Sequence, residues 1–239
     1  MNENLVIIPT YNEINNIEFI INKITSLNID VDILVVDDNS PDKTYEKVEF
    51  LKKNISNLYL IINNKKSGIG KAYIKGFEFA ISNNYSKIIQ IDADMSHDPN
   101  DIYRLLKYSK NYDLVIGSRY INGIRIVNWP LSRLALSYFA NLYAKIITGL
   151  NIYDCTGGYK CIDIDLLKSI NLNSINSQGY SFQIEINYRA CIKNFKIKEI
   201  PIIFTDRTIG KSKMSKRIII EAIFIVPMLR LKKILKLIK

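Results

Sequence analysis

Lys87–Asp98, K-I-I-Q-I-D-A-D-M-S-H-D, is the most informative segment of this sequence. Its first half is β-branched and apolar, as in a buried strand of a parallel sheet. It ends in two acids, Asp92 and Asp94, followed by the only histidine of the chain, His97. Two carboxylates this close at a strand end can share a hard cation such as Mg²⁺ or Mn²⁺. The alternative is a turn whose carboxylates cap a helix after Pro99.

Segments with strand and helix patterns alternate on both sides of this stretch. Short apolar runs predict further strands at 5–8, 33–36, 58–62 and 114–117. Helices are expected between the strands: one at about 14–27, one from the turn at 40–42 to about 54, one opened by 68–72 and running to about 82, and one after Pro99 to about 109. Short connections between such elements are typical of a doubly wound, mostly parallel α/β sheet flanked by helices. The later part predicts helices at about 130–148, 179–194 and 217–239, a glycine turn at 154–160 and a strand at 197–204.

Length and charge narrow the class of protein. The 239 residues suit one large domain, and a hydrophobic content of 48% is ample for a core. The formal net charge is +10, but nine bases and one acid lie after residue 210, so the body is nearly neutral. This distribution argues against a nucleic-acid binder and suggests that the tail meets an acidic surface.

Cysteine spacing and hydropathy suggest where the protein works. No C-x-x-C spacing occurs, so we expect reduced thiols in a cytosolic compartment, at Cys155, Cys161 and Cys191. The N-terminus enters a strand pattern directly, so no signal peptide is expected. The longest apolar candidate, Ile218–Leu229, is interrupted by Glu221 and Pro227 and is too short to span a bilayer.

Polar motifs also follow the first two expected strands. In P-T-Y-N-E at 9–13, Asn12 is expected to cap the next helix and Tyr11 to stack on a base. Asp37 and Asp38 close the second strand, where carboxylates can bind ribose hydroxyls or a base. The alternatives are that the first motif only starts a capped helix and that the second only forms a turn.

Together these motifs resemble the dolichol-phosphate mannose synthases, glycosyltransferases of family 2 with the GT-A (Rossmann-like) fold. The matching segments are P-T-Y-N-E (9–13), D-D-N-S-P-D (37–42), G-I-G-K-A (68–72), D-A-D-M-S-H (92–97), G-S-R-Y (117–120), N-W-P-L-S-R (128–133), G-G-Y-K (157–160), G-Y-S-F-Q-I-E (179–185) and D-R-T-I-G-K-S-K-M-S (206–215). The first four occur across many family 2 glycosyltransferases, whereas the later five are more specific to polyprenyl-phosphate acceptors. The resemblance implies inverting, metal-dependent transfer of mannose from GDP-mannose to dolichyl or polyprenyl phosphate.

The same resemblance implies roles for individual residues. Its nucleotide-sugar site would comprise Pro9, Tyr11, Glu13, Asp37, Asp38 and Asp92. The Mg²⁺ or Mn²⁺ ligands would be Asp94 and Ser96, the latter standing where some relatives carry glutamine. The acceptor phosphate would be held by Arg119, Arg133 and Lys213. Arg207 would lie with Lys213 on a loop that closes over both substrates, and the catalytic groups would be Asp92, Asp94, Arg119, Arg133 and Arg207.

The chemistry of such a transfer suits these residue types. A phosphate monoester has a second pKa of about 6, so near neutral pH it attacks without a base. His97 is therefore expected to be structural. A divalent cation would neutralise the departing diphosphate. Arginines offer fork-shaped contacts to phosphate.

The basic C-terminal segment completes the prediction. We expect a GT-A domain over residues 1–215 and a basic amphipathic helix over 216–239 that meets a membrane interface. The alternative is a helix packed on the core with a solvated basic end. A helix at the membrane interface would make the protein peripheral on the cytoplasmic face of a membrane. Several members of the family add transmembrane helices after this point, so a small membrane-protein partner is a further expectation.

Two other functions stay open from the sequence. The motifs of the first half also fit a polyprenyl-phosphate glucosyltransferase, or another family 2 transferase that uses a UDP-sugar. A non-catalytic, membrane-associated binding subunit is less favoured because the motif series is complete.

Overall fold

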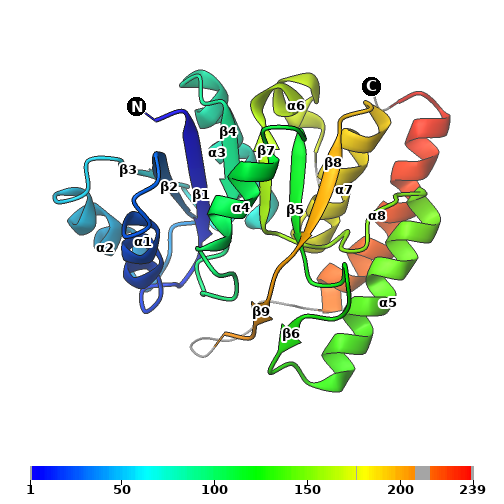
Figure 1. Ribbon diagram of the computed structural model, residues 1–239, viewed down its shortest axis with the longest axis horizontal. Helices are drawn as coiled ribbons and strands as arrows, with labels where there is room; N and C mark the ends of the chain where they lie inside the picture. The colour runs from blue at the N-terminus through cyan, green and yellow to red at the C-terminus, as the bar shows by residue number, and fades with distance from the viewer. Residues whose placement is uncertain (1, 176, 208–215, 238–239) are drawn as a thin grey trace.

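A computed structural model describes residues 2–175, 177–207 and 216–237. Within these ranges a seven-stranded sheet has the order β3-β2-β1-β4-β7-β5-β8, and helices cover both of its faces (Figure 1). Its strands are β1 (Asn4–Thr10), β2 (Val31–Asp37), β3 (Leu58–Ile62), β4 (Lys87–Gln90), β5 (Leu114–Ser118), β7 (Lys160–Asp163) and β8 (Ile197–Pro201). A separate two-stranded ribbon pairs β6 (Ile126–Val127) with β9 (Phe204–Thr205).

The helices form two layers because successive strand residues point to opposite faces. The helices are α1 (Ile17–Thr25), α2 (Thr44–Lys52), α3 (Ile69–Ser82), α4 (Asp101–Tyr108), α5 (Leu131–Thr148), α6 (Ile164–Ser169), α7 (Gly179–Ile192) and α8 (Lys216–Ile234), with a 3₁₀ turn at Leu172–Ser174. In β1, Leu5 and Ile7 pack in the core shared with α3, α6 and α7. Val6 and Ile8 pack in the core shared with α1, α2 and α4. Both faces of the sheet are therefore buried.

Strand β7 is absent from the sequence-based prediction, which has a glycine turn over 154–160. β7 lies between β4 and β5 and is antiparallel to both. The predicted strand at 197–204 also divides into β8 and β9 after Pro201, because proline has no N–H to donate to a sheet. The prediction of a mostly parallel sheet holds around this one antiparallel strand.

The start of α1 differs from the prediction as well. Asn12 does not cap this helix; it has a φ of 56°, and its Oδ1 accepts a 3.4 Å hydrogen bond from the Asp42 backbone N–H. The helix begins at Ile17, after Asn16. Pro9 and Thr10 end β1, and the following Tyr11, Asn12 and Glu13 lie in a loop joined to the loop after β2.

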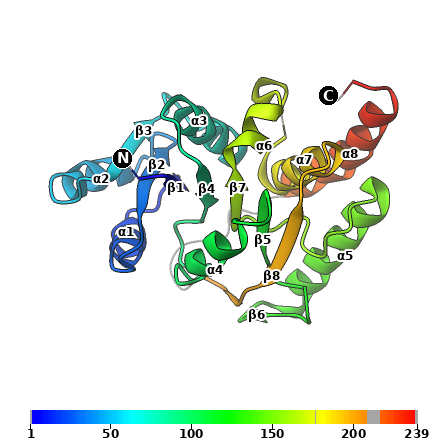
Figure 2. The same ribbon diagram turned by 45° about the horizontal axis from the view of Figure 1, so that its top comes forward.

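Helix α8 packs against α7 and α5 along one side of the molecule (Figure 2). Its Val226 and Leu229 are buried in the core, and the helix continues through Pro227. In the part of the chain that the structure describes, no helix is long and apolar enough to cross a membrane. Lys213 lies outside the described residues, as do the side chains of Ile218 and Ile219.

Candidate active site

The loop after β4 brings three predicted site residues together. Asp94 is buried, and its Oδ1 accepts a 3.1 Å hydrogen bond from the Ser96 backbone N–H. Its Oδ2 forms an ion pair of 2.7 Å with Nη2 of Arg207. The side chain of Asp92, two residues earlier, is 33% exposed at the same edge of the sheet. The D-A-D segment thus presents carboxylates at the carboxyl end of a central strand.

His97 packs as an interior side chain beneath this loop. Its ring stacks on Tyr159, with 4.9 Å between centroids, and meets Phe204 edge-on at 5.3 Å. Burial lowers the pKa of His97 to about 4, so the ring is neutral near pH 7. This packing fits the structural role expected for the histidine.

Asp37 and Asp38 are buried at the end of β2, where both make hydrogen bonds within the protein. Asp37 accepts hydrogen bonds of 2.7 Å from Thr10 Oγ1 and 2.8 Å from the Ser40 backbone N–H. Asp38 accepts a 2.8 Å hydrogen bond from the Gly68 backbone N–H, which shapes the turn before α3. The hydrogen bonds of both acids are those of a turn, as the alternative interpretation of this motif expected. Their role in nucleotide binding stays a prediction.

The remaining nucleotide candidates lie around the end of β1. Pro9 is in β1 itself, opposite Val36 of β2. Tyr11 follows the strand, and Nζ of Lys66 lies 4.0 Å from the centroid of its ring. Glu13 is buried and accepts a 2.8 Å hydrogen bond from Nδ2 of Asn16. An aromatic ring with a cation beside it, next to the D-A-D edge, suits a base and its phosphates.

Arg119, a predicted acceptor-phosphate ligand, is held in a buried ion pair. Its Nε and Nη2 donate to the two carboxylate oxygens of Asp154 at 2.8 and 2.7 Å, and Nη2 also donates to Thr156. Burial alone would raise the pKa of Asp154, but the Arg119 guanidinium holds it below its usual value. These contacts give Arg119 a structural role at the end of β5, and its contact with the acceptor phosphate stays a prediction.

Asp154→Asn is expected to destabilise the protein by about 3–5 kcal/mol, because it leaves the buried charge of Arg119 without its partner. Urea unfolding followed by circular dichroism measures this loss. Asp165→Asn is the matched control, since that side chain is 79% exposed, and a change of at most about 0.5 kcal/mol is expected there. Equal stability of both variants would contradict a supporting role for the Arg119 pair.

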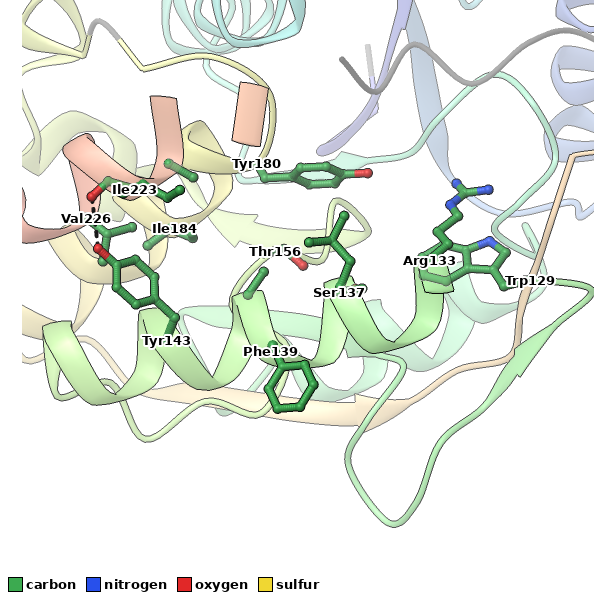
Figure 3. Close-up of a pocket in the computed structure, with 13 residues that line it drawn as sticks. Trp129, Arg133, Ser137, Phe139, Tyr143, Thr156, Tyr180, Ile184, Ile223 and Val226 are labelled. Atoms are coloured by element: carbon green, nitrogen blue, oxygen red, sulfur yellow. Dashed lines mark hydrogen bonds between the residues drawn. The ribbon is translucent and has the colours of Figure 1, made fainter. Parts of the chain in front are cut away.

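An apolar groove runs between α5, α7 and α8 (Figure 3). Its volume is about 210 Å³, and its walls include Leu136, Tyr143, Ile184, Ile223 and Val226. Tyr143 donates a 2.9 Å hydrogen bond to the Ile223 backbone carbonyl and so joins α5 to α8 at one end. Trp129 and Arg133 lie at the opposite end of the groove (Figure 3).

That polar end contains N–H groups that the described residues do not satisfy. Arg133 lies over the Trp129 ring, with its guanidinium carbon 4.1 Å from the ring centroid. Its Nη1 donates to both carboxylate oxygens of Asp206, at 2.9 and 3.0 Å. Arg133 Nε and Trp129 Nε1 are buried and find no hydrogen-bond partner among the described residues. Unsatisfied buried donors are costly, so a pair of them beside an apolar groove points to an anionic ligand with an apolar tail.

Comparison with known proteins identifies the family. The Glycosyl transferase family 2 profile matches residues 5–170. The chain belongs to glycosyl transferase family 2. An undecaprenyl-phosphate mannosyltransferase of Micrococcus luteus is 40% identical, over 92% of this chain and 90% of that protein. A polyprenol monophosphomannose synthase of Mycolicibacterium smegmatis is 42% identical, over 92% of this chain and 84% of that protein. The predicted family resemblance is confirmed.

Solved structures confirm the fold of this family 2 protein. Glucosyl-3-phosphoglycerate synthase of Mycobacterium tuberculosis, in complex with Mn²⁺, uridine diphosphate and glucosyl-3-phosphoglycerate, has a TM-score of 0.68. The match is 16% identical and covers 94% of this chain and 77% of that one. The predicted α/β fold of GT-A type is therefore correct.

The residues of this family 2 protein fit a divalent cation shared with a substrate. No cluster of three or more histidine, cysteine or acidic side chains suited to a metal occurs among the described residues. Mg²⁺ commonly takes only one or two carboxylates and completes its coordination with water and substrate phosphates. Asp92 and Asp94 would supply such carboxylates. Ser96 Oγ is a buried oxygen for which no hydrogen-bond partner is found in the described ranges.

Several site residues of the family 2 protein were missed by sequence reasoning. Trp129 and Asp206 contact Arg133, and Asp154 holds Arg119. Trp129 lies in the N-W-P-L-S-R motif and Asp206 in the D-R-T-I-G-K-S-K-M-S motif, so these motifs could have indicated both residues. Asp154 is 35 residues from its partner and had no local signal.

Lys160 is a buried base behind the site, between β7 and α7. Its Nζ donates to Asn187 Oδ1 at 2.7 Å and to the Gln183 carbonyl at 3.2 Å. Burial lowers the pKa of Lys160 to about 7. In the unfolded chain the pKa of a lysine is about 10.4. Between about pH 7 and this value, the Lys160 side chain is therefore protonated in the unfolded state and largely neutral in the folded state.

The contribution of Lys160 to the free energy of unfolding should therefore rise with pH between these two pKa values. We expect the gain in melting temperature between about pH 7 and about pH 9.5 to be smaller in Lys160→Met than in the unmodified protein. Differential scanning calorimetry at both pH values tests this difference. The exposed Lys168→Met is the control and should keep the original gain; an unchanged gain in Lys160→Met would refute the lowered pKa.

Proposed function

We propose that this chain transfers a mannosyl group from a nucleotide sugar to a polyprenyl phosphate. The observation that supports this most strongly is the apolar groove, which ends at the unsatisfied donors of Trp129 and Arg133. A polyprenyl phosphate combines the apolar chain and the anionic head that such a groove fits. The two relatives at 40% and 42% identity carry names for the same reaction type.

The donor in this proposal is GDP-mannose, and the acceptor is dolichyl phosphate or another polyprenyl phosphate. The base would lie near Tyr11, and the diphosphate near Asp92 and Asp94. These positions follow the edge of the sheet formed by the ends of β1, β2 and β4. A UDP-sugar is the competing donor in the test below.

Asp94, with Asp92 and Ser96, would hold a Mg²⁺ or Mn²⁺ ion in this proposal. Such an ion, when bound, supplies positive charge to the departing nucleoside diphosphate. Arg133 and Trp129 orient the acceptor phosphate with N–H donors, and the groove excludes water from its apolar chain. Because the acceptor is largely a dianion at neutral pH, no side chain has to remove a proton. Attack from the face opposite the diphosphate inverts the anomeric carbon and gives a β-mannosyl phosphate.

Transfer of radiolabelled mannose into a lipid-soluble product tests the proposed function. The full-length protein is incubated with GDP-[¹⁴C]mannose, undecaprenyl or dolichyl phosphate, detergent and Mg²⁺. We expect a labelled product that is labile to mild acid. Addition of EDTA before the reaction should prevent its formation. Parallel reactions with UDP-[¹⁴C]glucose should give none. Label transfer from the UDP-sugar alone, or binding without turnover for all donors, would contradict the proposal.

The exposed faces of α5 and α8 support a peripheral position on a membrane. Phe224 and Ile146 are 70% and 68% exposed, and Leu131 on α5 is 83% exposed. Lys232 and Lys233 lie in the last turn of α8. Apolar side chains beside bases favour an interface with anionic lipids. We therefore propose that residues 1–215 form the catalytic domain, that 216–239 bind the cytoplasmic face of a membrane, and that a small membrane protein assists.

Phe224→Asp is expected to weaken binding to vesicles that contain anionic phospholipid by about tenfold, since it places a charge at the interface. Co-sedimentation with phosphatidylglycerol-containing vesicles measures the change. Phe50→Asp on α2 is the matched control, because Phe50 is also exposed, at 56%, but belongs to another layer. Equal losses in both variants would show that α8 has no special contact with lipid.

A further inference from the structure

Two consecutive residues, Asp206 and Arg207, each form an ion pair with a different part of the site. Asp206 accepts hydrogen bonds from Arg133 at the end of the groove, at 2.9 and 3.0 Å. Arg207 pairs with Asp94 on the D-A-D loop at 2.7 Å. One dipeptide therefore connects the expected acceptor end with the expected cation end.

The backbone at Thr205 and Asp206 is hydrogen-bonded to two different segments. The Thr205 N–H donates to the Ser96 carbonyl at 3.2 Å, and the Asp206 N–H donates to the Val127 carbonyl at 3.1 Å. The side chain of Asp206 also accepts from the Arg207 N–H at 3.1 Å. The dipeptide is therefore anchored between the D-A-D loop and β6, and its two ion pairs come from adjacent residues.

Each of the two ion pairs has the charge arrangement of an expected complex. A carboxylate on Arg133 occupies the place where a phosphate would bind. A guanidinium on Asp94 occupies the place where a divalent cation would bind. Since like charges repel at such distances, each side chain in its present contact opposes binding of the corresponding ligand.

We propose that Asp206 competes with the acceptor phosphate for Arg133, and that Arg207 competes with the divalent cation for Asp94. Asp206 is thus a positioning residue whose release from Arg133 admits the acceptor. Displacement of Arg207 by the cation loosens the Asp206 contact next to it, so the cation strengthens acceptor binding, and the acceptor strengthens cation binding by the same factor. This inference rests on the proposed function, because it takes the acceptor to be a phosphate.

Isothermal titration of the full-length protein with two separate probes, MnCl₂ without nucleotide and farnesyl phosphate, tests the competition. We expect Arg207→Gln to bind Mn²⁺ about tenfold more tightly than the unmodified protein, and Asp206→Asn to bind farnesyl phosphate about tenfold more tightly. Each factor of ten corresponds to about 1.4 kcal/mol. Arg104→Gln, which removes an exposed arginine–carboxylate pair on α4, is the matched control and should bind both probes as the unmodified protein does.

Coupling between the probes separates competition from a merely structural pair of salt bridges. Saturating Mn²⁺ should raise the affinity of the unmodified protein for farnesyl phosphate, and this gain should shrink in Asp206→Asn. Unchanged or weaker binding of both probes in the two variants overturns the inference, whatever the transfer activity. Tighter binding in the variants together with no mannosyl transfer by the unmodified protein supports the inference and contradicts only the proposed reaction. Asp206→Ser, with an equal melting temperature as the criterion of folding, replaces Asp206→Asn if that variant unfolds.

Discussion

Replacing Asp94 with asparagine is expected to lower the rate of mannosyl transfer by at least about a thousandfold. Asp94 is the buried carboxylate at the carboxyl end of β4 and the proposed ligand of the divalent cation. An amide keeps the shape but loses the charge, and a thousandfold change corresponds to about 4 kcal/mol of transition-state stabilisation, which is within what a bound cation supplies. Initial rates with GDP-mannose and a polyprenyl phosphate at saturating Mg²⁺ measure the effect.

Asp98→Asn is the matched control for this substitution. Asp98 belongs to the same loop, but its side chain is exposed and accepts hydrogen bonds from Asn100. We expect its rate to stay within about twofold of the original. If Asp94→Asn and Asp98→Asn have equal rates, the cation site lies elsewhere. Circular dichroism and melting temperature must show that both variants are folded.

Arg133→Ala is expected to raise the KM for the polyprenyl phosphate by about a hundredfold while leaving the KM for the donor within about twofold. The reason is that Arg133 lies at one end of the apolar groove and supplies the fork-shaped donors for phosphate. Truncating one partner of a desolvated charge pair commonly costs about 2–5 kcal/mol, and a hundredfold change is about 2.7 kcal/mol. Steady-state kinetics with each substrate varied in turn give the two constants.

Two further variants sharpen the result for Arg133. Arg133→Lys should be intermediate, because lysine keeps the charge but loses the planar fork. Arg125→Ala is the control, since Arg125 is an exposed arginine just before β6. A change in donor KM equal to that in acceptor KM would assign Arg133 to the nucleotide sugar and contradict the placement of the acceptor in the groove.

The central strand and its acids were predictable because their signals are local. A β-branched run followed by D-A-D gives β4 and its loop directly, and the alternation of strands and helices gives the parallel part of the sheet. β7 was not predictable in the same way. It is a four-residue strand that enters between β4 and β5 in the opposite direction, and no local pattern specifies that neighbour.

The candidate site was predictable as a set of motifs but not as a set of contacts. The sequence singles out Arg119, but its partner Asp154 follows 35 residues later, so its burial in an ion pair has no local signature. The groove depends on the packing of α5, α7 and α8, which are separated by long stretches of sequence. The turn at the D-D-N-S-P-D motif was predictable from its residues. In the structure both buried acids of the motif accept backbone hydrogen bonds.

The claim on which this account depends is that the cation held at Asp94 lies beside the acceptor phosphate at Arg133. ³¹P relaxation of farnesyl phosphate, measured with the protein and substoichiometric Mn²⁺, tests that neighbourhood directly. We predict strong paramagnetic relaxation of the phosphorus that is lost in both Asp94→Asn and Arg133→Ala and is kept in Asp98→Asn. Relaxation that is the same in the unmodified protein and in all three variants would contradict the account.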